Sequence, residues 1–126
     1  MTDEQFKSLV EEGISALPPW VHDELTNVVF LVADVPNDRQ RIENDLGAHD
    51  VLFGLYEGVP LTERGDESPL LPDIITVFKD SILSTYTTEE EIRACVHNTV
   101  WHEVAHYFGH DEAWVREEEI RRGKLL

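Results

Sequence analysis

Two histidines and a glutamate occur at a spacing that suits a metal ion. In the segment WHEVAHYFGHDE, His102 and His106 are four residues apart, and Glu103 directly follows the first histidine. Residues four apart on an α-helix lie on one face, so both imidazoles can bind one Zn²⁺ ion at about 2.0–2.1 Å. Glu103 can then reach a water on the same ion and accept its proton. The spacing predicts a metal site with a general base beside it.

The residues that follow the histidines supply candidates for a third ligand. Gly109 stands where the helix must end and the chain turn back, and Glu112 comes ten residues after His102. We rank Glu112 first. Asp111 is second, because a turn shifted by one residue would bring it to the ion instead, and His110 is third. Two helix histidines alone are packing or surface residues as often as they are metal ligands. The adjacent glutamate, the glycine and the acid together favour the metal site.

The available ligand types indicate a catalytic rather than a structural site. Two histidines and one carboxylate leave the fourth position of zinc to water, whereas structural sites are more often closed by thiolates. The only cysteine, Cys95, lies two helical turns, about 10.5 Å, before His102, and we expect it to be a core residue. The other three histidines lack ligand spacing, and we expect them at the surface: His22, His49 and His97.

Apolar periodicity, together with turn and capping signals, predicts the elements that must position these residues. A capping-box signature, Thr87-Thr88 before Glu90-Glu91, begins the helix that carries the histidines, and Gly109 is a natural residue to follow its end. The other predicted elements are helices at 3–16, 20–25 and 112–123, a buried strand at 27–35, strands at 51–56 and 73–79, a mostly polar connection with one helical turn at 37–50, and a turn-forming segment at 61–72.

This order of elements predicts an α+β fold in a single domain, residues 1–126, with helices packed on one side of a small sheet. The strand at 73–79 is a candidate for aligning an extended peptide if it lies at the edge of the sheet. Tyr56 and Tyr86 are candidates for donating a hydrogen bond to a developing oxyanion, although a packing role is favoured for both.

Three segments resemble a known family: GLYEGVPLTER (54–64), LPDIITVFKD (71–80) and TVWHEVAHYFG (99–109). They occur in the order found in the small bacterial zincin-like metallopeptidases, or minimal zincins, whose motif is HExxHxxGxxD. The resemblance implies a compact zincin-like domain in which a small mixed sheet of about three strands packs against the active-site helix and flanking helices. It also implies a zinc peptidase with His102 and His106 as metal ligands and Glu103 as general base.

The chain departs from related patterns at two points. Glu112 stands where the family motif has aspartate, which is one methylene shorter, so the distance between ion and backbone would have to change. The only methionine is Met1, so the methionine turn that longer relatives place beneath the metal cannot form. Another side chain must pack there, and the candidates are Trp114 and Tyr107.

The composition narrows the expected partners and compartment. A formal net charge of −16 repels nucleic-acid backbones and anionic lipids, so we expect neither nucleic acid nor a membrane as a partner. The acidic N-terminal segment lacks the basic and apolar regions of a secretory signal, and a single cysteine fits a reducing cytoplasm. An exposed apolar face on so small a domain is compatible with a homodimer.

We therefore expect a cytoplasmic zinc-dependent peptidase that acts on a peptide or protein substrate. Zinc would polarise the scissile carbonyl and lower the pKa of its water towards about 7, and Glu103 would pass a proton to the leaving amine. The alternative is a catalytically inactive zincin-like protein that acts as a binding or regulatory module. The short chain and the atypical third-ligand position keep this alternative open.

Overall fold

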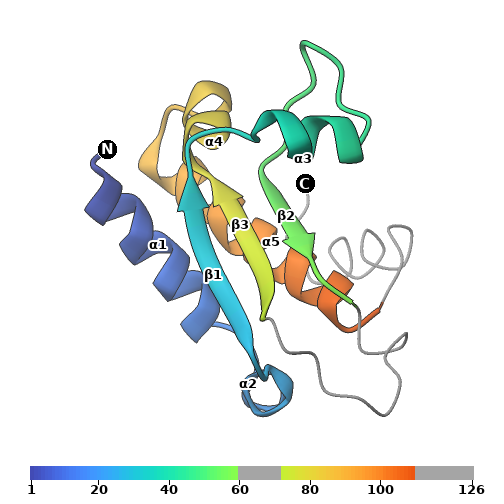
Figure 1. Cartoon of the computed structure of the whole chain (residues 1–126). Helices are drawn as coiled ribbons and strands as arrows, with labels where there is room; N and C mark the ends of the chain where they lie inside the picture. The colour runs from blue at the N-terminus through green and yellow to red at the C-terminus, as the bar shows by residue number, and fades with distance from the viewer. Residues whose placement is uncertain (60–71, 110–126) are drawn as a thin grey trace.

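The computed structural model describes residues 1–59 and 72–109, in which helices pack on a three-stranded mixed sheet (Figure 1). The strands are ordered β1-β3-β2, with β1 parallel and β2 antiparallel to β3. The α+β fold with a small mixed sheet is therefore confirmed. The elements in chain order are α1 (Asp3–Ser15), α2 (Pro19–Glu24), β1 (Val28–Ala33), α3 (Asp38–Glu43), β2 (Gly54–Glu57), β3 (Asp73–Phe78), α4 (Lys79–Thr85) and α5 (Glu89–Tyr107).

The order of the strands corrects two expectations. The strand predicted at 73–79 is β3, which lies in the centre of the sheet, so it is not the edge that could receive a peptide. The strand predicted to be buried is β1, which lies at an edge and exposes alternate side chains, with Val29 39% and Leu31 46% exposed. One face of β1 packs on the helices while the other faces solvent, as is common for a half-covered sheet.

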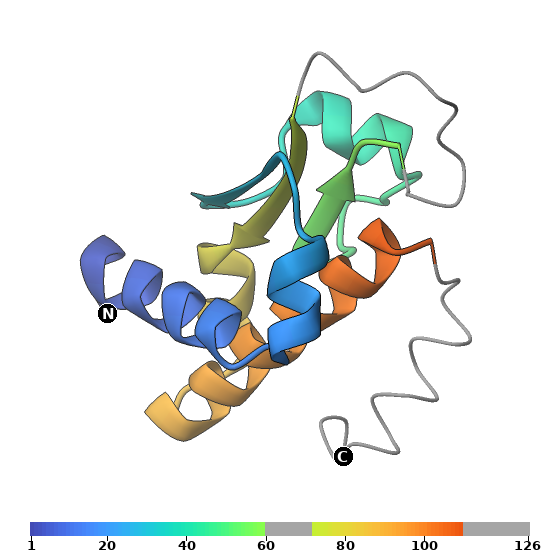
Figure 2. The ribbon, with the colours of Figure 1, turned by 90° about the horizontal axis from the view of Figure 1, so that it is seen from below.

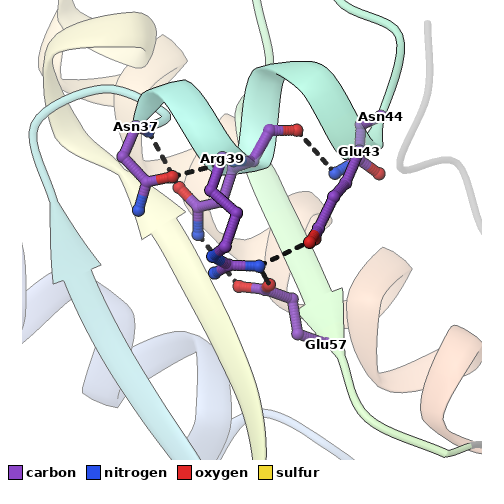
Figure 3. Close-up of polar contacts among 6 residues, drawn as sticks. Asn37, Arg39, Glu43, Asn44 and Glu57 are labelled. Atoms are coloured by element: carbon purple, nitrogen blue, oxygen red, sulfur yellow. Dashed lines mark hydrogen bonds and ion pairs between the residues drawn. The ribbon is translucent and has the colours of Figure 1, made fainter.

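Helices α1 and α5 cover one face of the sheet, and α3 lies against the other (Figure 2). Ile75 and Val77 of β3 are fully buried beneath the helices. Glu57 of β2 points to the opposite face, where Gln40 Nε2 of α3 donates a hydrogen bond to Glu57 Oε1 at 2.9 Å. Figure 3 shows α3 reaching Glu57 also through Arg39. The expectation that all helices pack on one side is wrong for α3, because polar pairing rather than an apolar stripe attaches it.

The limits of α5 agree with the local signals. Thr88 Oγ1 accepts the Glu91 N–H at 3.2 Å, and Glu91 Oε1 accepts the Thr88 N–H at 3.3 Å, which completes the predicted capping box. The helix ends at Tyr107, and Gly109 adopts a left-handed backbone with a φ of 89°. A glycine tolerates this conformation at little cost, so the chain turns where the sequence predicted.

Helix α4 is an element that the sequence signals did not predict. Phe78 at its N-terminus makes no side-chain cap hydrogen bond, so no start signal marks it. Burial of Ser81 and Ile82 and an ion pair of 2.6 Å between Lys79 Nζ and Asp3 Oδ1 attach it to the rest of the fold. The helix expected at 112–123 lies outside the described residues. Within the described residues, no helix is both long and apolar enough to cross a bilayer.

Candidate metal centre

The last two turns of α5 bring His102, Glu103 and His106 together. Their potential ligand atoms all lie within 4.8 Å of one another. The two imidazole rings are 5.0 Å apart between centroids, and His102 Nε2 lies 4.0 Å from Glu103 Oε2. The cluster follows directly from the four-residue spacing, because α5 is helical through this whole segment.

The chemistry of these donors fits zinc. Imidazole nitrogens and carboxylate oxygens are ligands that zinc takes in catalytic sites. With bonds of about 2.0–2.1 Å, neighbouring ligand atoms in a tetrahedral site are roughly 3.3 Å apart. The ligand nitrogens of His102 and His106, which lie within 4.8 Å of each other, need only a modest approach to reach this separation. Both histidines are only partly buried, so a solute can approach them.

A hydrogen bond from the sheet fixes the buried glutamate. Glu103 is 8% exposed, and its Oε1 accepts the backbone N–H of Tyr56 at 2.9 Å. A carboxylate that has lost most of its water needs such a donor, because an unpaired buried acceptor is costly. The bond joins α5 to strand β2 beside the histidines, and it holds Glu103 in one orientation.

The register of the sheet explains why the Tyr56 N–H is directed at the helix. Phe78 N donates to Phe53 O at 2.8 Å, so the backbone groups of Phe53 face β3. The direction of the backbone N–H and C=O groups alternates from residue to residue along an antiparallel pair. Those of Leu55 therefore point towards β3, and those of Tyr56 point towards the outer edge of β2. Glu103 meets the Tyr56 N–H on that outer side.

The two tyrosines considered as oxyanion donors have other contacts. Tyr56 donates its hydroxyl to Asp73 Oδ2 at 2.7 Å, and its ring meets the edge of Tyr107 at 6.1 Å between centroids. Tyr86 packs on Phe53 at 6.0 Å. These contacts agree with the packing role that the sequence favoured. Tyr107, which directly follows the cluster in sequence, is fully buried at this end of the core.

A hollow of about 290 Å³ lies beside the cluster. Asn98 stands one helical turn before His102, and its buried Oδ1 has no hydrogen-bond partner within the part of the chain that the structure describes. The hollow gives a bound molecule room next to the histidines. Sequence reasoning missed it, because it forms only where the segment before β2 packs on α5. Its lining residues are Val51, Leu52, Phe53, Gly54, Asn98, Thr99, His102 and Glu103.

The remaining cysteine and histidines lie apart from the cluster, as expected. Cys95 is partly buried against the core, and burial raises the pKa of its thiol to about 11. His97 Nε2 lies 2.9 Å from Glu12 Oε2 of α1, and the hydrogen bonds from His97 and Arg93 hold the pKa of Glu12 below its usual range. The other two are exposed: His22 and His49.

The three candidates for a third ligand, Glu112, Asp111 and His110, lie outside the described residues, as does Trp114. The ranking of these candidates therefore stays a prediction. The described residues supply the two imidazoles and the neighbouring carboxylate, all from one helix.

The comparison with known families covers most of the chain. A model of the zincin-like metallopeptidase family matches residues 25–122. The match includes all three strands and the whole helix that carries the cluster. No curated protein is similar enough to the chain to count as a match. Since the family model spans well over half of the 126 residues and the sheet and cluster agree with it, the chain belongs to the zincin-like metallopeptidase family.

Proposed function

We propose that this chain is a zinc-dependent peptidase in which His102 and His106 bind the metal and Glu103 is the general base. One observation carries the proposal: the ligand atoms of these three residues converge within 4.8 Å on one helix. Membership of a metallopeptidase family supports hydrolysis of peptide bonds and zinc as the cofactor.

The described side chains have distinct tasks in this reaction. When bound, zinc supplies a Lewis acid that polarises a carbonyl oxygen and lowers the pKa of a water towards about 7. Glu103 Oε1 is held by the Tyr56 N–H, and Oε2 lies on the side of His102. Glu103 Oε2 takes the proton of the attacking water and delivers it to the leaving amine. The bond to Tyr56 keeps the carboxylate in place during both transfers.

The third protein ligand is proposed to be Glu112, with Asp111 as the second candidate and His110 as the third. Alanine substitution of each in turn, followed by measurement of the zinc affinity, separates them. Only substitution of the true ligand should strongly weaken zinc binding. Equal zinc affinity in all three variants would contradict a third ligand from this segment.

The proposal is tested by zinc content and peptide cleavage in matched variants. Zinc is measured by elemental analysis, and cleavage is read by mass spectrometry on a proteome-derived peptide library. Glu103→Gln should keep zinc but cleave about 10²–10⁴-fold more slowly, because an amide cannot take the proton. His106→Ala should lose zinc and cleavage together. His97→Ala removes a histidine of the same helix outside the cluster, and it should retain both.

Three results would overturn parts of the proposal. Equal cleavage by Glu103→Gln and the parent would remove Glu103 from the role of base. Failure to bind zinc, even after zinc is added, would contradict the metal site. Stoichiometric zinc without cleavage of any peptide or folded protein would contradict the peptidase and favour the binding or regulatory module.

A further inference from the structure

The contact between β2 and α5 depends on a residue without a side chain. A Cβ atom added to Gly54 would lie 2.4 Å from Thr99 Cγ2, 3.2 Å from Thr76 O and 3.3 Å from Glu103 Cγ. The first distance is about 1 Å shorter than a tolerable contact, and the other two are already tight. The backbone of β2 therefore lies directly against α5 at the turn that carries Glu103. An isolated glycine in a strand pattern is a sequence signal for such a close approach.

The atoms around Gly54 cannot easily move aside. Thr99 is buried, and its branched side chain has few rotamers available in a helix. Thr76 O belongs to the backbone of β3, which is paired with β2 and lies in the centre of the sheet. A side chain at position 54 would therefore push β2 away from α5 by roughly 1 Å.

This displacement would act on the general base. Tyr56 lies two residues after Gly54, so the two residues share one face of the sheet. The Tyr56 N–H is 2.9 Å from Glu103 Oε1. A displacement of 1 Å along this bond would lengthen the distance to about 3.9 Å, beyond the range of a hydrogen bond, and a sideways displacement would misalign the N–H. Glu103 would then lose the Tyr56 N–H as a donor.

We propose that Gly54 is a positioning residue for Glu103. It keeps β2 at the one distance from α5 at which the Tyr56 backbone N–H binds Glu103 Oε1. The role of Glu103 as the base rests on the proposed function. The contact between Tyr56 and Glu103, however, can be measured without any catalytic activity, so the two ideas can fail separately.

The direct test is amide hydrogen exchange of Tyr56, measured by NMR on the full chain. Glu103→Ala should accelerate exchange of this amide by roughly 10- to 100-fold, as expected for loss of a hydrogen bond to a carboxylate. Gly54→Ala should accelerate it by a similar factor. Glu103→Gln should exchange like the parent, because the amide oxygen still accepts the bond.

A second substitution provides a rescue. Thr99→Ser removes the methyl group that a Cβ at position 54 would meet first, so Gly54→Ala with Thr99→Ser should return Tyr56 exchange to within about threefold of the parent. Gly13→Ala is the matched control, because Gly13 is a buried glycine of α1 whose Cβ would contact the other side of α5 at His97. It should leave the Tyr56 amide unchanged.

The outcomes separate the two proposals. Parent-like exchange of Tyr56 in Gly54→Ala would overturn the positioning role, whatever the activity. If the parent cleaves peptides, Gly54→Ala should lower kcat on the order of 100-fold with KM and zinc content nearly unchanged, and the double variant should recover it. Unchanged kcat despite lost Tyr56 protection would also overturn the role. An inactive parent would contradict the proposed function alone, since the exchange measurement would still decide the contact.

Discussion

Gln40 joins helix α3 to strand β2, and its removal offers a quantitative test of how this attachment works. Its Nε2 donates to Glu57 Oε1 at 2.9 Å, while its Oε1 accepts the Asn37 N–H at 3.0 Å in the capping box of α3. Arg39 Nη1 adds an ion pair of 2.9 Å to Glu57 Oε2 (Figure 3). Gln40 thus contributes once to the helix and once to the contact with the sheet.

The expected cost follows from these two contributions. A hydrogen bond to a charged group contributes about 1.5–3 kcal/mol, and the partial exposure of Glu57 favours the lower end of that range. The reciprocal bond of a capping box adds about 0.5 kcal/mol. We expect Gln40→Ala to lower the free energy of unfolding by about 2 kcal/mol. In a double-mutant cycle with Glu57→Ala, the cap contribution cancels and a coupling of about 1–1.5 kcal/mol should remain.

The coupling should also depend on pH with a defined sign. Burial raises the pKa of Glu57, but the hydrogen bonds from Gln40 and Arg39 outweigh it and hold the pKa below its usual value of 4.5. A carboxyl group whose pKa is lowered in the folded state stabilises the fold above its unfolded pKa. That stabilisation is lost as the pH falls through the lower, folded value. The coupling should therefore be complete at pH 7 and shrink below pH 4.5.

The assay is urea unfolding followed by circular dichroism at pH 7 and at stepwise lower pH. Gln5→Ala is the matched control, because Gln5 closes the capping box of α1 and accepts the Thr2 N–H at 2.8 Å but, among the described residues, bonds to no strand. It should cost only about 0.5 kcal/mol. An equal cost for Gln40→Ala and Gln5→Ala, or a coupling that does not change with pH, would refute the reasoning.

Three further predictions concern α5. Thr88→Ala should lower the free energy of unfolding by about 1 kcal/mol through loss of the cap, while Thr87→Ala should be nearly neutral, and equal costs in urea unfolding would contradict this. Val100→Ala should cost about 2 kcal/mol in the same assay, because Val100 is fully buried, and a cost below 0.5 kcal/mol would show that the core there is loosely packed. Cys95 should react with a disulfide reagent at pH 8 on the order of 100-fold more slowly than a free thiol, because a pKa of about 11 leaves little thiolate, and a rate like that of free cysteine would disprove it.

The helix that carries the cluster could be predicted because its signals are local. The capping pair at Thr88, the glycine after the helix end and the spacing of His102 and His106 all lie within one stretch of chain. The spacing places the histidines on one face whatever the rest of the fold does. The approximate positions of β1, β2 and β3 were also predicted, because short β-rich apolar runs between turn residues are local signals too.

Apart from α4, whose start carries no cap signal, the features that were wrong or missed depend on pairing between distant segments. Which strand lies in the centre, and which face α3 covers, is decided by contacts that no short window contains. The bond from Tyr56 to Glu103 joins residues 47 positions apart, so the spacing around the histidines carries no sign of it. Gly54 had a weak local signal, a glycine inside a strand pattern, but its partner Thr99 could be identified only from the packing of β2 on α5.

The hydrogen bond between Tyr56 and Glu103 has a consequence for solubility. Strand β2 is four residues long and pairs with β3 alone within residues 1–59 and 72–109, so its outer side is an edge of the sheet that these residues form. Backbone N–H groups at such an edge can recruit a strand from another molecule and start aggregation. Glu103 occupies one of these donors from within the same chain. A Glu103→Ala variant, made to abolish chemistry, should therefore aggregate sooner at high concentration than Glu103→Gln, which keeps the edge covered.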